Sequence, residues 1–238
     1  MTFTDFYLWP MLIGGAFMLI GLVVSSTLRR KFKKYAQTPL MSGMSGAEVA
    51  QKMLDDHNIG DVQVLCVDGQ LTDHYNPMKR TVNLSRDVYE GRNAAATAVA
   101  AHECGHAVQH ATGYSMLKFR SAMVPLQNVS GMLMNLIVMA SIFGGYALYA
   151  AFPLNEVLYV VVGSQAVITL FTIVTLPVEF DASNRALAWV KSNGVVTSQE
   201  YGMAKDALKW AAMTYVVAAL AAIANLLYWV MMLLGADE

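Results

Sequence analysis

Four long stretches of this sequence contain no charged residue, and they constrain the fold more than any other feature. They cover residues 6–28, 121–155, 157–178 and 211–235. A helix of about 20 apolar residues is long enough to cross the roughly 30 Å hydrocarbon core of a bilayer. The stretches therefore predict four transmembrane helices, with a turn near Asn155 between the second and the third. We expect a mainly α-helical membrane protein.

The overall composition agrees with a membrane protein and excludes some partners. Charged residues make up 14% of the 238 residues, whereas soluble domains contain about 25%. The formal net charge of −1 argues against nucleic acid as the main partner. Cys66 and Cys104 lie outside any Cys-x-x-Cys pattern. Two separate thiols fit a reducing compartment.

The positions of the basic residues predict how the chain crosses the membrane. Every Lys and Arg lies within 29–120 or 185–209, and neither terminus carries one. Four spans place both of these segments on one side, which the positive-inside rule identifies as the cytoplasm. Both termini are then expected outside. The basic cluster at 29–34 follows the first apolar stretch instead of preceding it, so we expect a retained span and no signal peptide.

This topology divides the chain into five segments. They are the first transmembrane helix with its basic flank (1–34), a cytoplasmic α+β segment (35–120), the second and third transmembrane helices (121–178), a cytoplasmic helical segment (179–210), and the fourth transmembrane helix with the C-terminus (211–238). An interfacial approach is expected around Pro125, ahead of the second span.

The cytoplasmic segment begins with a helix and two strands. Ser45-Gly46-Ala47-Glu48 forms a capping box that predicts a short helix to about Asn58. Residues 62–67 and 81–84 are β-prone and are separated by turn signals, so they predict a small sheet. An extended peptide could add to the edge of such a sheet. Alternatively, the two strands form a hairpin that only caps the helix that follows.

That following helix is rich in small residues and is expected from Ala94 to Ala111. Asn93 is suited to the N-cap, and Gly113 lies just beyond the end. Such a surface suits a helix that is packed on several sides. The helix carries the pattern His-Glu-x-x-His. Three ionisable groups on a tightly packed helix require partners that compensate their burial.

The spacing of this pattern predicts a catalytic zinc site. Residues four apart share one face of a helix, so His102 and His106 can bind the same ion. Catalytic zinc keeps one position for water and lowers the pKa of that water. Glu103 could then accept a proton from the water as it attacks a carbonyl group. The alternative is a pair of structural histidines beside a solvated Glu103.

A catalytic zinc site needs a third protein ligand. On a straight helix His110 is turned about 80° away from His102, so one ion cannot easily reach all three histidines. Glu179 follows Pro177 at the end of the third span, at a depth where a carboxylate is costly unless it is paired or bound to metal. We expect Glu179 to complete a Zn²⁺ site with His102 and His106. The alternative for Glu179 is an acid at the level of the lipid headgroups.

Other polar residues could support this site. Asp181 can pair with Arg185 along the helix or can orient a ligand histidine. Arg185 and His74 are candidates for stabilising an oxyanion. We expect His74 on a loop beside the strands and His57 on the surface at a helix end.

Three segments together resemble the bacterial YugP-like family of neutral zinc metallopeptidases. They are residues 71–77, 100–107 and 176–183, with the sequences LTDHYNP, AAHECGHA and LPVEFDAS. The resemblance extends over essentially the whole chain. It implies a membrane-bound, zinc-dependent peptidase of the bacterial cytoplasmic membrane, with its site at the cytoplasmic face.

The chain is more distantly similar to the membrane gluzincins, such as the HtpX heat-shock protease and the CAAX prenyl protease. In those enzymes a downstream Glu completes the metal site, which implies Glu179 as the third ligand and Glu103 as the base. Those relatives also have an Asp four residues after the ligand Glu. This sequence has Ser183 at that position, and Asp181 lies only two residues after Glu179.

We therefore predict a zinc endopeptidase that acts on membrane or membrane-adjacent proteins, with the bilayer and a peptide substrate as partners. Two alternatives belong to other classes. One is a membrane scaffold or chaperone-like subunit with a vestigial metal site, and the other is a metal-dependent hydrolase of a different amide. Glu103 favours an enzyme, because a purely structural metal site does not need that carboxylate.

Overall fold

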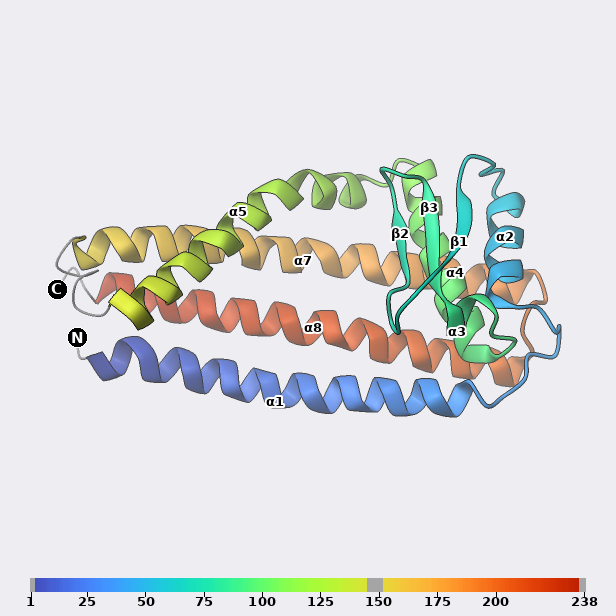
Figure 1. Ribbon diagram of the computed structural model, residues 1–238, viewed down its shortest axis with the longest axis horizontal. Helices are drawn as coiled ribbons and strands as arrows, with labels where there is room; N and C mark the ends of the chain where they lie inside the picture. The colour runs from blue at the N-terminus through green and yellow to red at the C-terminus, as the bar shows by residue number, and fades with distance from the viewer. Residues whose placement is uncertain (1–2, 145–151, 236–238) are drawn as a thin grey trace. The chain divides into compact units, whose positions relative to one another are not determined.

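The computed structural model describes residues 3–144 and 152–235 (Figure 1). Within these residues, four helices are long and apolar enough to cross a membrane, as the sequence predicts. They are α1 (Phe3–Tyr35), α5 (Ser115–Gly144), α7 (Leu154–Ser192) and α8 (Ser198–Leu234).

Helix α5 differs from the expectation at its start. It begins at Ser115 and continues through Pro125, where the sequence suggested a separate interfacial approach. A proline inside a helix removes one backbone donor. Helices in membranes tolerate that loss where neighbouring groups satisfy the freed carbonyl. The residues on both sides of Pro125 therefore stay in one helix.

Internal contacts divide the chain into two compact units. One unit comprises Met1–Leu22, Phe119–Thr175 and Tyr215–Glu238, and the other comprises Val23–Lys118 and Leu176–Thr214. Within the first unit, two buried side chains of α7 donate to the same carbonyl of α8. Gln165 Nε2 lies 3.2 Å and Thr169 Oγ1 lies 3.1 Å from the oxygen of Ala222.

The second unit contains a three-stranded sheet. Its strands are β1 (Gln63–Val67), β2 (His74–Asn76) and β3 (Thr81–Ser85), in the order β1-β3-β2. The two predicted strands are present, but β3 runs parallel to β1, so the alternative of a hairpin is wrong. Parallel neighbours require a crossover, and here the connecting chain contributes β2.

Strand β2 was not predicted, and His74 was expected on a loop. The structure instead pairs His74 with Asn83 in an antiparallel ladder at the edge of the sheet. Three residues are too few to display an alternating pattern, which explains why β2 escapes detection. The strand ends at a turn in which the Asn76 side chain accepts hydrogen bonds from the backbone N–H groups of Met78 and Lys79.

The core of the second unit lies between the sheet and its helices. Helix α2 (Gly46–Asp56) starts with the predicted capping box, since Ser45 and Glu48 each accept the other's backbone N–H. A short helix, α3 (Arg86–Tyr89), follows β3 directly. The largest buried side chains of this core come from α2 and β3 and include Met53, Leu54 and Leu84.

Helix α4 spans Ala94–Ala111, as predicted. Asn93 caps it, because its Oδ1 accepts the N–H of Ala96 at 2.9 Å. Gly113 follows the end with φ near +67°, a conformation that favours glycine. Most residues of α4 are buried, including Ala94, Ala100 and Ala101. The helix is therefore fixed in the centre of the unit, with the His-Glu-x-x-His pattern on it.

Candidate metal centre

His102, His106 and Glu179 meet in the second unit. Their closest nitrogen and oxygen atoms all lie within 4.8 Å of one another. Glu179 Oε2 is 3.3 Å from Nε2 of His102 and 3.6 Å from Nε2 of His106. The two imidazole rings stand nearly perpendicular, with centroids 4.8 Å apart. One oxygen and two nitrogens therefore converge on a common point.

A glycine allows α7 to reach these histidines. Gly105 lies between them on α4, and a Cβ atom placed on it would be 2.5 Å from the carbonyl oxygen of Ala182. Any residue with a Cβ at this position would clash with the backbone of Ala182, so only glycine permits this close approach of α7 to α4. Because Ala182 lies three residues after Glu179, the contact at Gly105 brings the carboxylate beside the ligand face of α4.

The burial of Glu179 indicates that a cation belongs at this point. The residue is 3% exposed, and its Oε2 has no hydrogen-bond partner among the described residues. A buried carboxylate oxygen without a partner is costly unless it binds a metal or another positive charge. Two histidines and one carboxylate form a ligand set found in catalytic zinc sites. The residues present therefore fit zinc.

The electrostatics around His106 also favour positive charge. Burial lowers the pKa of His106, but the nearby carboxylate of Glu179 and the charge of Glu103 raise the pKa by more than burial lowers it. The net effect is a pKa above the ordinary value of 6.5. A negative local potential of this kind suits a bound cation.

Glu103 lies beside the three convergent residues and contacts the edge of the sheet. It is 9% exposed, and its Oε2 accepts the backbone N–H of Tyr75 in β2 at 3.0 Å. It is not part of the convergent group. A carboxylate held in this way, one residue along from His102, is available for proton transfer next to the metal position.

Each histidine has a partner at its other ring nitrogen. Ser183 Oγ is 3.1 Å from Nδ1 of His102, and Gln109 Oε1 is 3.0 Å from Nδ1 of His106. Ser183 thus contacts a ligand from the position where the distant relatives have an Asp. Gln109 was not predicted, although its place three residues after His106 on one helix makes the contact possible.

Asp181 and Arg185 form the predicted ion pair, with Arg185 Nε 2.5 Å from Asp181 Oδ2. Asp181 reaches His106 only through Gln109, whose Nε2 donates to it at 2.8 Å. The guanidinium group of Arg185 also lies over the ring of Tyr114, at 5.7 Å. Of the two roles suggested for Asp181, the structure shows the ion pair with Arg185, and its contact with His106 is indirect, through Gln109.

The remaining histidines lie outside the convergent group. His110 Nδ1 is 2.7 Å from the hydroxyl of Tyr75. His74 is exposed, with Nδ1 2.7 Å from the Thr72 carbonyl oxygen, and Asn83 contacts its Nε2. His57 is at the C-terminal cap of α2 and is exposed, as expected.

Comparison with known families agrees with this geometry. The family model described as "Putative neutral zinc metallopeptidase" matches residues 10–234. The chain belongs to this zinc metallopeptidase family. It is also 40% identical over 213 residues to "Putative membrane protease YugP" of Bacillus subtilis (strain 168), covering 89% of this chain and 91% of that protein. No solved structure matches the chain significantly.

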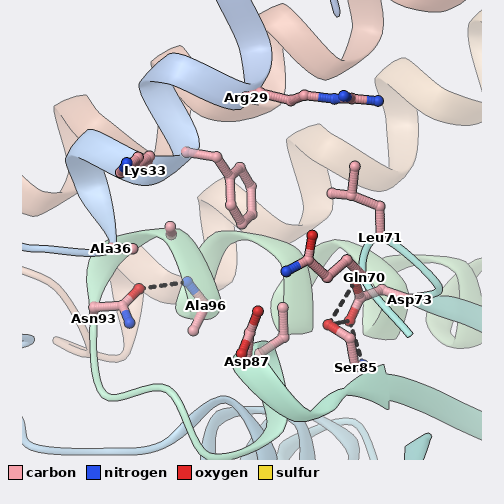
Figure 2. A pocket seen from close by; sticks show the side chains of 13 residues that line it. Arg29, Lys33, Ala36, Gln70, Leu71, Asp73, Ser85, Asp87, Asn93 and Ala96 are labelled. Carbon is pink, nitrogen blue, oxygen red and sulfur yellow. Dashed lines mark hydrogen bonds between the residues drawn. The ribbon is translucent and has the colours of Figure 1, made fainter. Parts of the chain in front are cut away.

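A separate cavity of about 690 Å³ lies near the end of α1 in this zinc metallopeptidase (Figure 2). None of the three convergent residues lines it. Its walls come from the last turns of α1, the loop before β2, the junction of β3 and α3, and the start of α4. Asp73 forms part of one wall and accepts hydrogen bonds from the backbone and hydroxyl of Ser85.

Proposed function

We propose that this protein is a membrane-embedded zinc endopeptidase that hydrolyses peptide bonds of membrane or membrane-adjacent proteins. The observation that carries the proposal is the convergence of His102, His106 and Glu179, with Glu103 beside them. Membership of a zinc metallopeptidase family and four apolar helices support the same conclusion.

In this proposal His102 and His106 bind zinc through Nε2, and Glu179 binds it through Oε2. When bound, zinc would act as a Lewis acid that lowers the pKa of water and polarises the substrate carbonyl. Glu103 would accept the proton of the attacking water and pass it to the leaving amine. Ser183 and Gln109 would keep the two imidazole rings in the required orientation.

The edge of the sheet offers a site for the substrate chain. Among the described strands, β2 pairs only with β3, and the N–H of Tyr75 points from the other side of β2 to Glu103. An extended peptide that adds to this edge would lie next to the carboxylate of Glu103. We therefore propose that substrates bind as an additional strand along β2.

We further propose that the metal centre faces the cytoplasm and that both termini lie outside. The support is the restriction of all Lys and Arg residues to 29–120 and 185–209. The five-segment division given above follows from this topology. A cytoplasmic site agrees with two unpaired cysteines, Cys66 and Cys104, in a reducing compartment.

Glu103→Gln tests the catalytic proposal in detergent-purified protein. The amide keeps the shape of the side chain but cannot accept the proton, so peptide turnover should fall by at least about 100-fold. Zinc content should remain at the wild-type level. Turnover that persists in Glu103→Gln would contradict the role of Glu103. A wild type that binds zinc but cleaves only non-peptide amides would favour the broader hydrolase.

Zinc content tests the ligand set separately. Glu179→Ala should lose zinc, because it removes one of three ligands, whereas His110→Ala should retain it. Zinc retained in Glu179→Ala but lost in His110→Ala would show that the ligand set is wrong. A wild type without any zinc would favour the scaffold alternative.

A further inference from the structure

The side chain of Gln109 is fully buried and makes three polar contacts in the second unit. Its Oε1 lies 3.0 Å from Nδ1 of His106. Its Nε2 donates to the carbonyl oxygen of Val178 at 2.7 Å and to Asp181 Oδ2 at 2.8 Å. All hydrogen-bonding groups of the amide are directed at named partners, and two of the partners belong to α7.

These partners determine how the amide is oriented. The carbonyl of Val178 and the carboxylate of Asp181 only accept hydrogen bonds, so the NH₂ group of Gln109 must face them. Its oxygen must then face His106. Arg185 holds Asp181 in place through the ion pair at 2.5 Å. A flipped amide would turn its oxygen towards two acceptors and would remove the donor that Val178 now has in a buried site.

The orientation of the amide determines the tautomer of His106. Since Gln109 offers only an acceptor to Nδ1, that nitrogen carries the ring proton. The lone pair of Nε2 is then free on the side that faces Glu179. Without this partner, a neutral imidazole could place its proton on either nitrogen, and one of the two tautomers cannot bind a metal through Nε2.

We propose that Gln109 is a positioning residue of the metal centre. It holds His106 in the tautomer that binds metal, and it ties α4 to the residue that precedes Glu179. One side chain thereby sets two of the three ligands. The inference rests on the proposed zinc site and concerns a role that the His-Glu-x-x-His pattern does not include.

The test compares zinc affinity of purified full-length variants by chelator competition, together with the absorption spectrum of the cobalt-substituted protein. Gln109→Met keeps the size of the side chain but removes all three contacts. We expect about 10- to 100-fold weaker zinc binding, the usual effect of losing a partner of a ligand histidine. The cobalt bands should shift, because the ligand geometry changes.

Gln165→Met is the matched control, since Gln165 is also a buried helical glutamine that donates to a carbonyl. It should leave zinc affinity and the cobalt spectrum unchanged. Equal losses in both variants would overturn the proposal, because they would reflect general destabilisation. Wild-type affinity in Gln109→Met would overturn it as well.

A polarity swap covers the case in which Gln109→Met does not fold. In Gln109→Glu the carboxylate faces Asp181 and should weaken zinc binding, whereas adding Asp181→Asn supplies a donor and should restore at least part of the affinity. Failure of the second change to restore any affinity would contradict the network. If the wild-type protein itself binds no zinc, the proposed function fails. If the wild type binds zinc and substitution of Gln109 does not change the affinity, only the proposal for Gln109 fails.

A different observation, the charge arrangement in the cavity near the end of α1, carries a second inference. Figure 2 shows Arg29 and Lys33 on the α1 wall and Asp87 on the opposite side. None of these three side chains has an ion pair within the described part of the chain. The cavity therefore has positive groups on one wall and a negative group on the opposite side, and none of them is in an ion pair of the described residues.

The position of this cavity, beside the end of the apolar stretch of α1, suggests a lipid headgroup as its ligand. Arg29 is the first charged residue after the apolar stretch 6–28, which puts it at the depth of the phospholipid headgroups. Leu71, which also lines the cavity, is 60% exposed and offers an apolar surface. We propose that the cavity binds a zwitterionic phosphoamine headgroup, with the phosphate at Arg29 and Lys33 and the ammonium at Asp87.

Native mass spectrometry of the full chain with phosphatidylethanolamine or phosphatidylglycerol tests this site. We expect preferential retention of phosphatidylethanolamine. Retention should be about fivefold weaker in Arg29→Ala and unchanged in Arg30→Ala, since Arg30 is also exposed but does not line the cavity. Asp87→Asn should abolish the preference for the zwitterion.

Competition with soluble glycerophosphoethanolamine identifies the source of the ligand. If glycerophosphoethanolamine displaces the lipid at millimolar concentration, the headgroup is sufficient for binding. If it does not displace the lipid, the acyl chains are required. Equal losses in Arg29→Ala and Arg30→Ala would overturn the proposal, as would equal binding of the two lipids by wild type. An increase in KM for peptide in Arg29→Ala, without lipid retention by wild type, would assign the cavity to substrate instead.

Discussion

The two histidines of the proposed metal centre contact different residues, a serine on α7 and a glutamine on α4. Ser183 meets Nδ1 of His102 at 3.1 Å, and a hydroxyl is a weaker partner for an imidazole than a carboxylate. Among the described residues, the partner at Nδ1 is therefore a hydroxyl or an amide in both rings, and no carboxylate contacts that nitrogen. The carboxylate of Asp181 contacts Gln109, which in turn contacts His106.

The Ser183 contact leads to a prediction about zinc affinity. Ser183→Ala removes the partner of His102, so zinc binding should weaken by about tenfold, near the lower end of the range for such contacts. Ser183→Asp should restore or exceed wild-type affinity, because a charged acceptor strengthens the hydrogen bond to Nδ1–H. Chelator competition measures both. Unchanged affinity in Ser183→Ala would show that the serine does not orient the ring.

At the scale of the elements, the decisive contact is the crossing of α4 and α7 at Gly105. The glycine has no Cβ, and the backbone of α7 at Ala182 occupies the space that a Cβ would need. The same crossing places Glu179 within 4 Å of both histidines. Close approach of two backbones therefore assembles the ligand set.

Gly105→Ala should separate the two helices and weaken both folding and metal binding. Overpacking of this kind costs about 1–3 kcal/mol in the free energy of unfolding. Gly202→Ala is the control, because Gly202 lies in α8 with no atom within 4 Å of an added Cβ. That change should be neutral or stabilise by up to about 1 kcal/mol. Thermal unfolding and zinc titration of both variants decide the question, and a stable, zinc-binding Gly105→Ala would refute the explanation.

At the scale of the whole molecule, the distribution of charge and the two cysteines allow the membrane topology to be measured. Cys66 is exposed on β1, whereas Cys104 is buried in α4. Burial raises the pKa of the Cys104 thiol, which keeps it protonated and unreactive. The native chain therefore carries one reactive thiol on the unit that contains the metal centre.

A membrane-impermeant maleimide should label this protein in inside-out vesicles but not in intact spheroplasts. The reason is that the proposed topology places Cys66 in the cytoplasm. Cys66→Ala should remove the label, which identifies the site, while Cys104 should stay unlabelled in both preparations. Labelling of Cys66 in intact spheroplasts would invert the proposed topology.

The sequence by itself determined the features that depend on local geometry. The four apolar helices, the capping box at Ser45 and the extent of α4 all follow from spacings of a few residues. Such patterns are reliable because the helix fixes the direction of each side chain relative to its neighbours. The same reasoning placed His102 and His106 on one face.

Only the tertiary structure decided which distant groups meet that face. The strand β2, the contact of Tyr75 with Glu103 and the roles of Gln109 and Ser183 depend on how α7 and the sheet pack against α4. The sequence indicated Glu179 because burying a carboxylate is costly. The structure shows that His102 and His106 lie beside it. Packing between segments far apart in the chain depends on every contact in the unit, so no local spacing encodes it.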